Sequence, residues 1–146
     1  MTTLLSKLAG IDNPARPADC IAADIVRLVN AAIRSGPWRD NPNLPAYTSV
    51  LNYGLPPLAV TGQSTLDLNE WAAAVQRSLA HFEPRLVPQS LEVEARLEEL
   101  GVPGSPHGSR WPVFRIRAEL RDGGAPFLLN LGMDCVNGQA FAAPAR

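Results

Sequence analysis

The sequence lacks any apolar run approaching the roughly 18 residues that a membrane-spanning helix requires. Its first ten residues contain one lysine and no long hydrophobic stretch, so they do not resemble a secretory signal. Cysteine is scarce: Cys20 and Cys135 lie far apart and form no CxxC motif, which favours two reduced thiols over a disulfide or a metal site. These absences predict a cytoplasmic protein with no direct membrane insertion.

Charged residues are also few, at 18% of the chain against about 25% in typical soluble domains. The formal net charge of -1 gives no electrostatic attraction to nucleic acid. There is no phosphate-binding loop, no zinc-ligand spacing and no nucleophile elbow. His81 and His107 are isolated from other candidate ligands. We therefore expect no nucleic-acid partner, no metal and no cofactor.

Hydrophobic residues are plentiful, at 46%, and so is proline, with 14 of the 146 residues. This length and hydrophobic content predict one globular domain with a buried core. The prolines break the chain into a few uninterrupted segments, which are the candidate helices and strands. Residues 1–18 are predicted to form an N-terminal arm, and residues 19–146 the folded domain.

Two segments have the apolar spacing of amphipathic helices. The first is predicted over residues 19–35, with Asp19 as its N-cap. The second is predicted over residues 66–82, where Asp67 followed by Glu70 resembles a capping box. Both apolar stripes are expected in the core, and the largest side chains on the second are Trp71 and Phe82.

Beyond residue 90 the apolar period changes to two, which is typical of strands. Strands are predicted at residues 91–97, 113–121 and 127–133, with a short fourth strand at 139–142. In the first of these, Leu97 is expected to face the core. The fold class is therefore α+β: two main helices followed by an antiparallel β-meander of three to four strands in a single domain.

The most informative local feature is the corner where the second helix stops, His81-Phe82-Glu83-Pro84-Arg85-Leu86. Proline disfavours helical geometry in the residue before it, so an extended backbone is predicted here. In an extended chain residues two apart share a face, so Glu83 and Arg85 should project together as a partly exposed ion pair. Such a pair is either a brace within the chain or a surface that another protein binds.

Catalysis is the competing interpretation of the same residues. Glu83 could be the general acid of a glycosidase, with Asp67 or Glu70 as the second carboxylate. A catalytic acid must hold its proton, usually in an apolar pocket, whereas the neighbouring Arg85 would favour the charged form. The sequence therefore argues against an enzyme.

Two segments together carry a family resemblance. One is Ser49-Val50-Leu51-Asn52-Tyr53-Gly54-Leu55-Pro56-Pro57-Leu58, and the other is Phe82-Glu83-Pro84-Arg85-Leu86 between the second helix and the first strand. The chain resembles, over nearly its whole length, the TssE family of type VI secretion baseplate wedge subunits and their relatives in contractile phage tails. That family was historically labelled lysozyme-like, although its members in these machines are structural.

The resemblance implies a non-catalytic subunit of the baseplate at an inner-membrane-anchored secretion apparatus. Its implied partners are the baseplate subunits TssF, TssG and TssK and the sheath proteins TssB and TssC. Glu83, Pro84 and Arg85 match the docking motif of the family, and Asn52, Tyr53 and Gly54 match a segment expected to be structural, here predicted as a turn. A wedge subunit of a phage tail or tailocin, or a lysozyme-like enzyme acting on peptidoglycan, are the alternatives.

The C-terminal hairpin is a second candidate surface. Residues 139–142 carry no charge, and the preceding strand is also uncharged. Uncharged edge strands invite another chain to pair with their free backbone groups. We expect this hairpin to form, or to lie beside, the edge that receives a strand from the first sheath ring.

Overall fold

The computed structural model describes residues 17–31, 41–45, 53–55, 67–134 and 138–144. Two helices precede a sheet: α2 spans Pro17–Asn30 and α3 spans Leu68–Phe82. After a short 3-10 turn, η3 (Pro88–Ser90), the strands are β1 (Glu92–Glu99), β2 (Arg110–Glu119), β3 (Pro126–Met133) and β4 (Ala140–Ala143). The predicted α+β class is confirmed.

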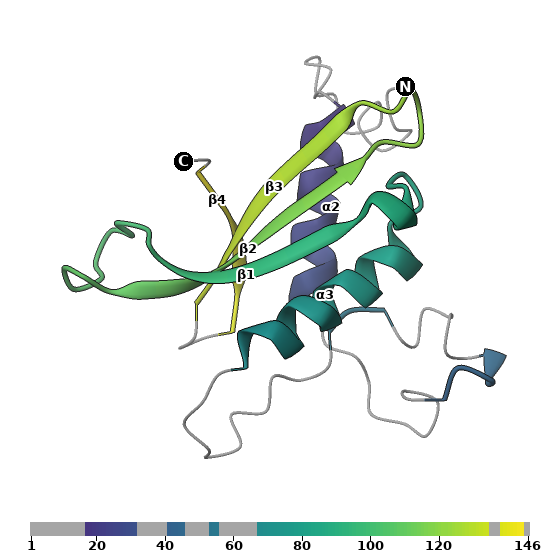
Figure 1. Cartoon of the computed structure of the whole chain (residues 1–146). Helices are drawn as coiled ribbons and strands as arrows, with labels where there is room; N and C mark the ends of the chain where they lie inside the picture. The colour runs from purple at the N-terminus through teal and green to yellow at the C-terminus, as the bar shows by residue number, and fades with distance from the viewer. Residues whose placement is uncertain (1–16, 32–40, 46–52, 56–66, 135–137, 145–146) are drawn as a thin grey trace, which may run out of the picture.

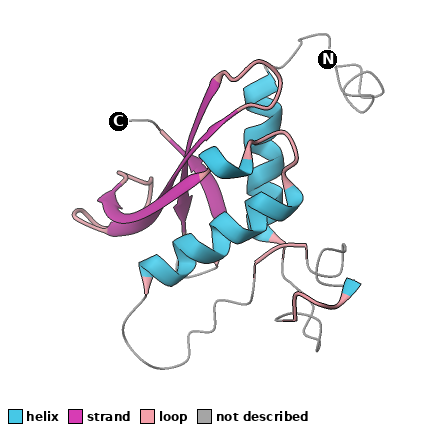
Figure 2. Ribbon diagram, turned by 45° about the vertical axis from the view of Figure 1, so that its right-hand side comes forward, coloured by secondary structure: helices cyan, strands magenta, loops and turns pink. Residues whose placement is uncertain are grey.

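The four strands form one antiparallel sheet in the order β1-β2-β3-β4, so each strand pairs with its neighbour in sequence. The register pairs Ala95 with Phe114, Phe114 with Leu131, and Leu131 with Ala142. Both helices lie against the same side of the sheet, α3 along β1 and α2 along β3 and β4 (Figures 1 and 2). β1 and β4 are consequently the two edges.

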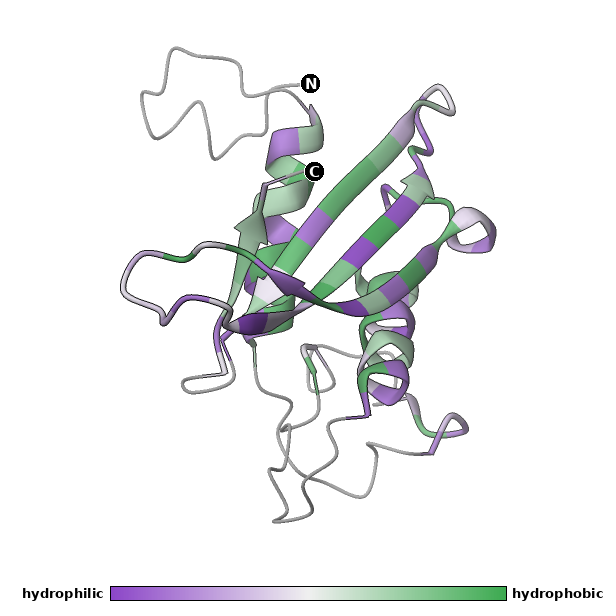
Figure 3. Cartoon of the chain, turned by 60° about the vertical axis from the view of Figure 1, so that its left-hand side comes forward, coloured by the Kyte–Doolittle hydropathy of each residue, from purple (hydrophilic) through white to green (hydrophobic). Residues whose placement is uncertain are grey.

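The core lies between the helices and one face of the sheet, as the helical and strand periodicities predict. It takes its members from both helices and from alternate positions of β2 and β3, among them Ile25, Leu28, Val75, Leu79, Phe114, Ile116, Leu131 and Met133. The polar and apolar alternation is visible along β2, whereas β3 is mostly hydrophobic (Figure 3).

Two details of the prediction are wrong, and a third holds only in part. Asp19 lies in the first turn of α2 and is not its N-cap, because the helix already begins at Pro17, a residue whose missing N–H costs nothing in a first helical turn. Leu97 is 45% exposed, because β1 runs beyond the N-terminal end of α3 into a projecting hairpin (Figure 1). Trp71 and Phe82 contact the core but are only partly buried.

The second helix begins where its capping residue dictates. The Asp67 carboxylate accepts hydrogen bonds from the backbone N–H groups of Asn69 and Glu70, at 3.0 and 3.2 Å. The helix therefore begins at Leu68, two residues later than predicted, and Glu70 lies in its first turn where a negative charge suits the helix dipole.

Candidate functional site

The corner after α3 is a tight turn, not the extended segment that the sequence predicts. Glu83 is the C-cap of α3, and its N–H donates to the Leu79 carbonyl at 3.0 Å. Pro84 and Arg85 occupy the turn, which the Leu86 N–H closes by donating to the Glu83 carbonyl at 3.3 Å. Pro84 disfavours continuation of the helix, and the turn makes Glu83 and Arg85 close neighbours.

Glu83 and Arg85 form a two-point ion pair across this turn. Arg85 Nε donates to Glu83 Oε1 at 2.6 Å, and Arg85 Nη2 donates to Glu83 Oε2 at 2.7 Å. The Arg85 backbone N–H also donates to Glu83 Oε1, at 3.2 Å. The expected ion pair is therefore present and partly exposed, with Arg85 37% exposed and Glu83 only 5% exposed. This pair is a brace within the chain.

Asp24, on the polar face of α2, completes the charged cluster. Arg85 Nη2 donates to Asp24 Oδ2 at 2.7 Å, and Arg27 Nη1 donates to Asp24 Oδ1 at 2.9 Å. One guanidinium thus joins α2 to the end of α3. The sequence places Asp24 and Arg27 three apart on the polar side of the first helix, but nothing in that spacing indicates a partner 61 residues further along the chain.

The electrostatics of the cluster follow from these contacts. The hydrogen bonds that Arg85 donates to Glu83 raise the pKa of Arg85 above its ordinary value, and the bond to Asp24 acts in the same direction although burial opposes it. Tyr53 lies nearby, and burial raises the pKa of its phenol, with the negative charges of Asp24 and Glu83 adding to the effect. Arg85 is therefore a permanent cation, and Tyr53 stays neutral at physiological pH.

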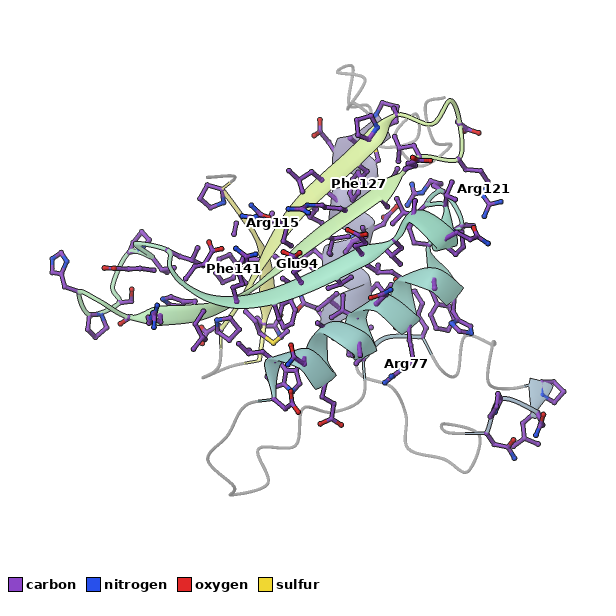
Figure 4. All side chains as sticks on the ribbon, in the orientation of Figure 1. Arg77, Glu94, Arg115, Arg121, Phe127 and Phe141 are labelled. Carbon is purple, nitrogen blue, oxygen red and sulfur yellow. The ribbon has the colours of Figure 1, made fainter. Side chains whose placement is uncertain are left out.

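The backbone of the turn is held by Arg121, which lies just after β2. The Arg121 N–H donates to the Arg85 carbonyl at 2.8 Å, and Arg121 Nε donates to the Pro84 carbonyl at 2.9 Å. Figure 4 shows Arg121 beyond the end of β2, beside this corner. The adjoining Val87 N–H donates to the Glu119 carbonyl at 2.9 Å. The corner is therefore fixed by bonds to both helices and to the sheet.

A surface hollow of about 390 Å³ lies over the corner, and we call it the corner hollow. Its charged part is the ion-pair cluster, and the remainder of its lining is largely apolar. The lining residues are Asp24, Leu28, Tyr53, Phe82, Glu83, Pro84 and Arg85. Tyr53 and Phe82 meet edge to face there, with ring centroids 5.4 Å apart. The hollow thus combines an apolar wall with a partly exposed arginine.

The segment carrying Tyr53 is anchored through Gly54. Gly54 has a φ of +114°, and a Cβ at this position would collide with the Ala31 carbonyl oxygen. That oxygen accepts from the Leu55 N–H at 3.0 Å, and Ser78 Oγ donates to the Gly54 carbonyl at 2.6 Å. Gly54 thus attaches this segment to α3 and to the residue that follows α2, while Tyr53 lines the hollow. Asn52 lies outside the described residues.

The geometry does not assemble the glycosidase pair considered from the sequence. Asp67 and Glu83 cap opposite ends of α3, whose 15 residues span about 22 Å, and Glu70 is only one turn closer. Paired catalytic carboxylates lie about 5–9.5 Å apart. Asp24 does approach Glu83, but the Arg85 guanidinium bonds to both carboxylates. The two carboxylates are therefore bridged by a guanidinium and do not face each other across an open space.

Two further features bear on the kind of site this is. Within the described part of the chain, no group of three or more His, Cys, Asp or Glu side chains is placed to hold a metal ion. Among the same residues, no helix has the length and apolar character needed to cross a membrane.

The family of the chain follows from a comparison with known protein families. The family model of baseplate wedge protein gp25 matches residues 15–125, which is more than half of the chain. The protein belongs to this baseplate wedge family, which is also the family of TssE. It is a structural component of a phage tail-like baseplate. No curated protein and no solved structure gives a significant match.

The residues matched by the family model include the corner after α3. It covers both helices, the Glu83-Pro84-Arg85 turn and the first two strands, and it stops before β3 and β4. The corner hollow therefore lies within the region shared with the family, whereas the β4 edge lies outside it.

Proposed function

We propose that this protein is the wedge subunit of a type VI secretion baseplate, where it docks with TssF, TssG and TssK and helps to start the TssB-TssC sheath. Family membership carries the baseplate role. The particular observation that supports docking is the corner hollow, where a rigid turn holds a partly exposed arginine beside an apolar wall. The proposed location is cytoplasmic, at the inner-membrane-anchored apparatus.

Arg85 can bind a further partner although it already bonds to Glu83 and Asp24. Its Nε and Nη2 groups are used within the chain, whereas Nη1 makes no hydrogen bond with any described residue. The side chain remains 37% exposed. A carboxylate or backbone carbonyl of a wedge partner could therefore accept from Nη1 without disturbing the brace. Pro84 and Tyr53 would supply apolar contact beside it.

Co-purification with a TssF-TssG wedge tests the docking proposal. Arg85→Lys keeps a cation beside Glu83 but removes the planar fork of donors. We expect a folded variant that recovers at least tenfold less wedge complex than the wild-type chain. The matched control is Arg96→Lys, because Arg96 pairs with Glu94 at the same two-residue spacing on exposed β1.

Thermal melts of both variants separate docking from folding. Wedge recovery by Arg85→Lys equal to that of the wild type would contradict the proposal. A loss of binding that merely follows a loss of folded protein would leave Glu83 and Arg85 as a brace alone.

The sheath part of the proposal rests on β4, an edge strand. The Asp134 N–H donates to the Gln139 carbonyl at 2.9 Å, so these two residues form a hydrogen-bonded pair. Hydrogen-bonded and non-hydrogen-bonded pairs alternate along an antiparallel ladder. The backbone groups of Phe141 therefore face β3, and those of Ala140 and Ala142 face outward. Ala142 is exposed and no described residue pairs with its outward groups. A strand from the first sheath ring can pair there.

Proline substitution tests this edge. Ala142→Pro removes the outward N–H and leaves the β3–β4 ladder intact, which edge strands tolerate. We expect cells that form baseplates without sheaths. Phe141→Pro instead removes a ladder bond and reports the cost of damaging the hairpin itself. Sheaths of normal number and length with a folded Ala142→Pro variant would place the contact elsewhere.

The alternative within the same family is a wedge subunit of a phage tail or tailocin. Neighbouring genes for a secretion ATPase, as opposed to other tail genes, distinguish the two. Lysozyme-like activity has a direct test in the clearing of a cell-wall suspension, and we expect none. A clearing rate that Glu83→Gln abolishes would overturn the structural assignment.

A further inference from the structure

The outward edge of β4 is already occupied at one of its two outward-facing residues. Ala140 is opposite Met133 in a pair without mutual hydrogen bonds, so its N–H and C=O point away from β3. The side-chain amide of Asn30 meets both groups. Ala140 N–H donates to Asn30 Oδ1 at 2.7 Å, and Asn30 Nδ2 donates to the Ala140 carbonyl at 3.0 Å.

A carboxamide has the same donor and acceptor as a backbone peptide group, so Asn30 occupies the place that a pairing strand would take. Its position is fixed, because Asn30 is the last residue of α2 and the following Ala31 N–H still bonds to the Arg27 carbonyl at 3.0 Å. Beyond Ala142, the next outward position is Pro144, which has no N–H to donate. Ala142 is therefore the one outward residue of the described β4 edge with both groups open.

We propose that Asn30 guards the β4 edge: it prevents a second copy of this chain from pairing there and leaves Ala142 as the one outward residue of the described edge that a partner strand can bind. Pairing of two β4 edges about a two-fold axis needs consecutive outward residues on each copy. With Asn30 bonded to Ala140, only Ala142 of the described β4 edge keeps open outward groups, and one residue is too few for an edge-to-edge dimer. A partner strand that binds here can take both open groups of Ala142 but must make its other contacts outside β4, and this last point rests on the proposed function.

The opposite edge offers a matched comparison. On the β1 side, Gln76 Nε2 of α3 donates to the Leu91 carbonyl at 3.0 Å. This is also a helix-borne amide on an edge, but the bond is single and lies just before the strand begins. β1 also carries charged residues along its length, including Glu92, Glu94 and Arg96, which discourage pairing without a guard. Gln76→Ala should therefore not lead a second copy of the chain to pair with the open edge of β1.

The test is the mass of the purified chain in solution, together with amide hydrogen exchange. The wild-type chain should remain a monomer of 15.7 kDa as its concentration rises. Asn30→Ala should give a mass that rises toward twice that value as the concentration rises. At low concentration, where the variant is still a monomer, exchange at the Ala140 amide should be accelerated at least tenfold. The double variant Asn30→Ala/Ala142→Pro should return to a monomer, and Gln76→Ala should never leave it.

A folded Asn30→Ala variant that remains a monomer at every concentration would overturn the proposal. If that variant does not fold, Asn30→Ser replaces it, because a serine side chain is too short to meet both Ala140 groups. Failure of both to fold would show that the amide only attaches α2 to the sheet, and would also overturn it. No sheath protein enters this experiment, so its failure leaves the Ala142→Pro test of the proposed function unaffected.

Discussion

Removal of the Arg85 guanidinium should destabilise the fold measurably, because Arg85 is the charged partner of a buried carboxylate. In the wild-type chain the Glu83 side chain is 5% exposed, and Arg85→Ala removes the guanidinium donors to both of its oxygens. The backbone N–H of residue 85 is then the donor that remains to Oε1. Asp24 is less affected, since it is 42% exposed and retains Arg27. The cost therefore falls mainly on Glu83.

The burial of the two partners sets the size of the effect. Removing one member of a fully buried ion pair costs about 3–5 kcal/mol, whereas exposed pairs contribute about 0–1 kcal/mol. The Arg85 side chain is 37% exposed, so water can take over part of its place beside Glu83. We expect Arg85→Ala to lower the free energy of unfolding by about 1–3 kcal/mol.

Urea unfolding followed by circular dichroism measures this free energy. The control is Arg96→Ala, which breaks a pair whose side chains are 61% and 44% exposed, and should change it by less than about 0.5 kcal/mol. A double-mutant cycle with Glu83→Ala should show coupling between Glu83 and Arg85. An Arg85→Ala variant as stable as Arg96→Ala, with no coupling to Glu83, would refute the brace.

Three further predictions concern the core, the glycine anchor and the tyrosine of the corner hollow. Leu79→Ala, at a fully buried position, should lower the free energy of unfolding by about 2–5 kcal/mol. Trp71→Ala, at a partly buried position, should lower it by about 1–3 kcal/mol. Equal losses in urea unfolding would contradict the different burial of the two side chains. Gly54→Ala should destabilise the fold by more than about 3 kcal/mol, because it adds a clash with the Ala31 carbonyl oxygen to backbone strain. Gly124→Ala, at φ +64° with open space around it, should cost only about 1–2 kcal/mol. A melting temperature of Gly54→Ala no lower than that of Gly124→Ala would contradict the close approach. The raised pKa of Tyr53 means that the folded chain binds the phenolic proton more tightly than the unfolded chain, so stability should fall as pH rises above 10.0, and Tyr53→Phe should reduce that fall in unfolding experiments at alkaline pH.

The sequence predicts the helices and strands well because each has a clear apolar period and a clear stop. The β2 and β3 alternation fixes which residues enter the core, and Phe114, Ile116 and Leu131 are buried as expected. The prediction that Leu97 is buried fails, because periodicity indicates which face of a strand is apolar but not how far the covering helix extends. The same limit explains why Trp71 lies at the margin of the core.

The candidate site could be predicted only in part. Pro84 marks the corner, and the charges on either side of it indicate an ion pair, which the structure contains. The sequence could not show that the corner is a turn with Glu83 buried inside it, because that depends on the packing of α2 against α3. The contact of Arg85 with Asp24 depends on the same packing. The guard at Ala140 needs the strand register as well as the place where α2 ends.

The central claim is that the corner hollow is the surface by which this chain docks into the baseplate wedge, and a photo-crosslink from position 53 tests it most directly. Tyr53→p-benzoylphenylalanine places a reactive group in the hollow and leaves the Glu83–Arg85 brace intact. The control is the same substitution at Leu97, which is exposed on β1 beyond α3. In cells that assemble the secretion system, the account predicts a covalent adduct with TssF or TssG from position 53 and none from position 97. An adduct with either wedge subunit from position 97 alone, with position 53 unreacted in assembled baseplates, would contradict it.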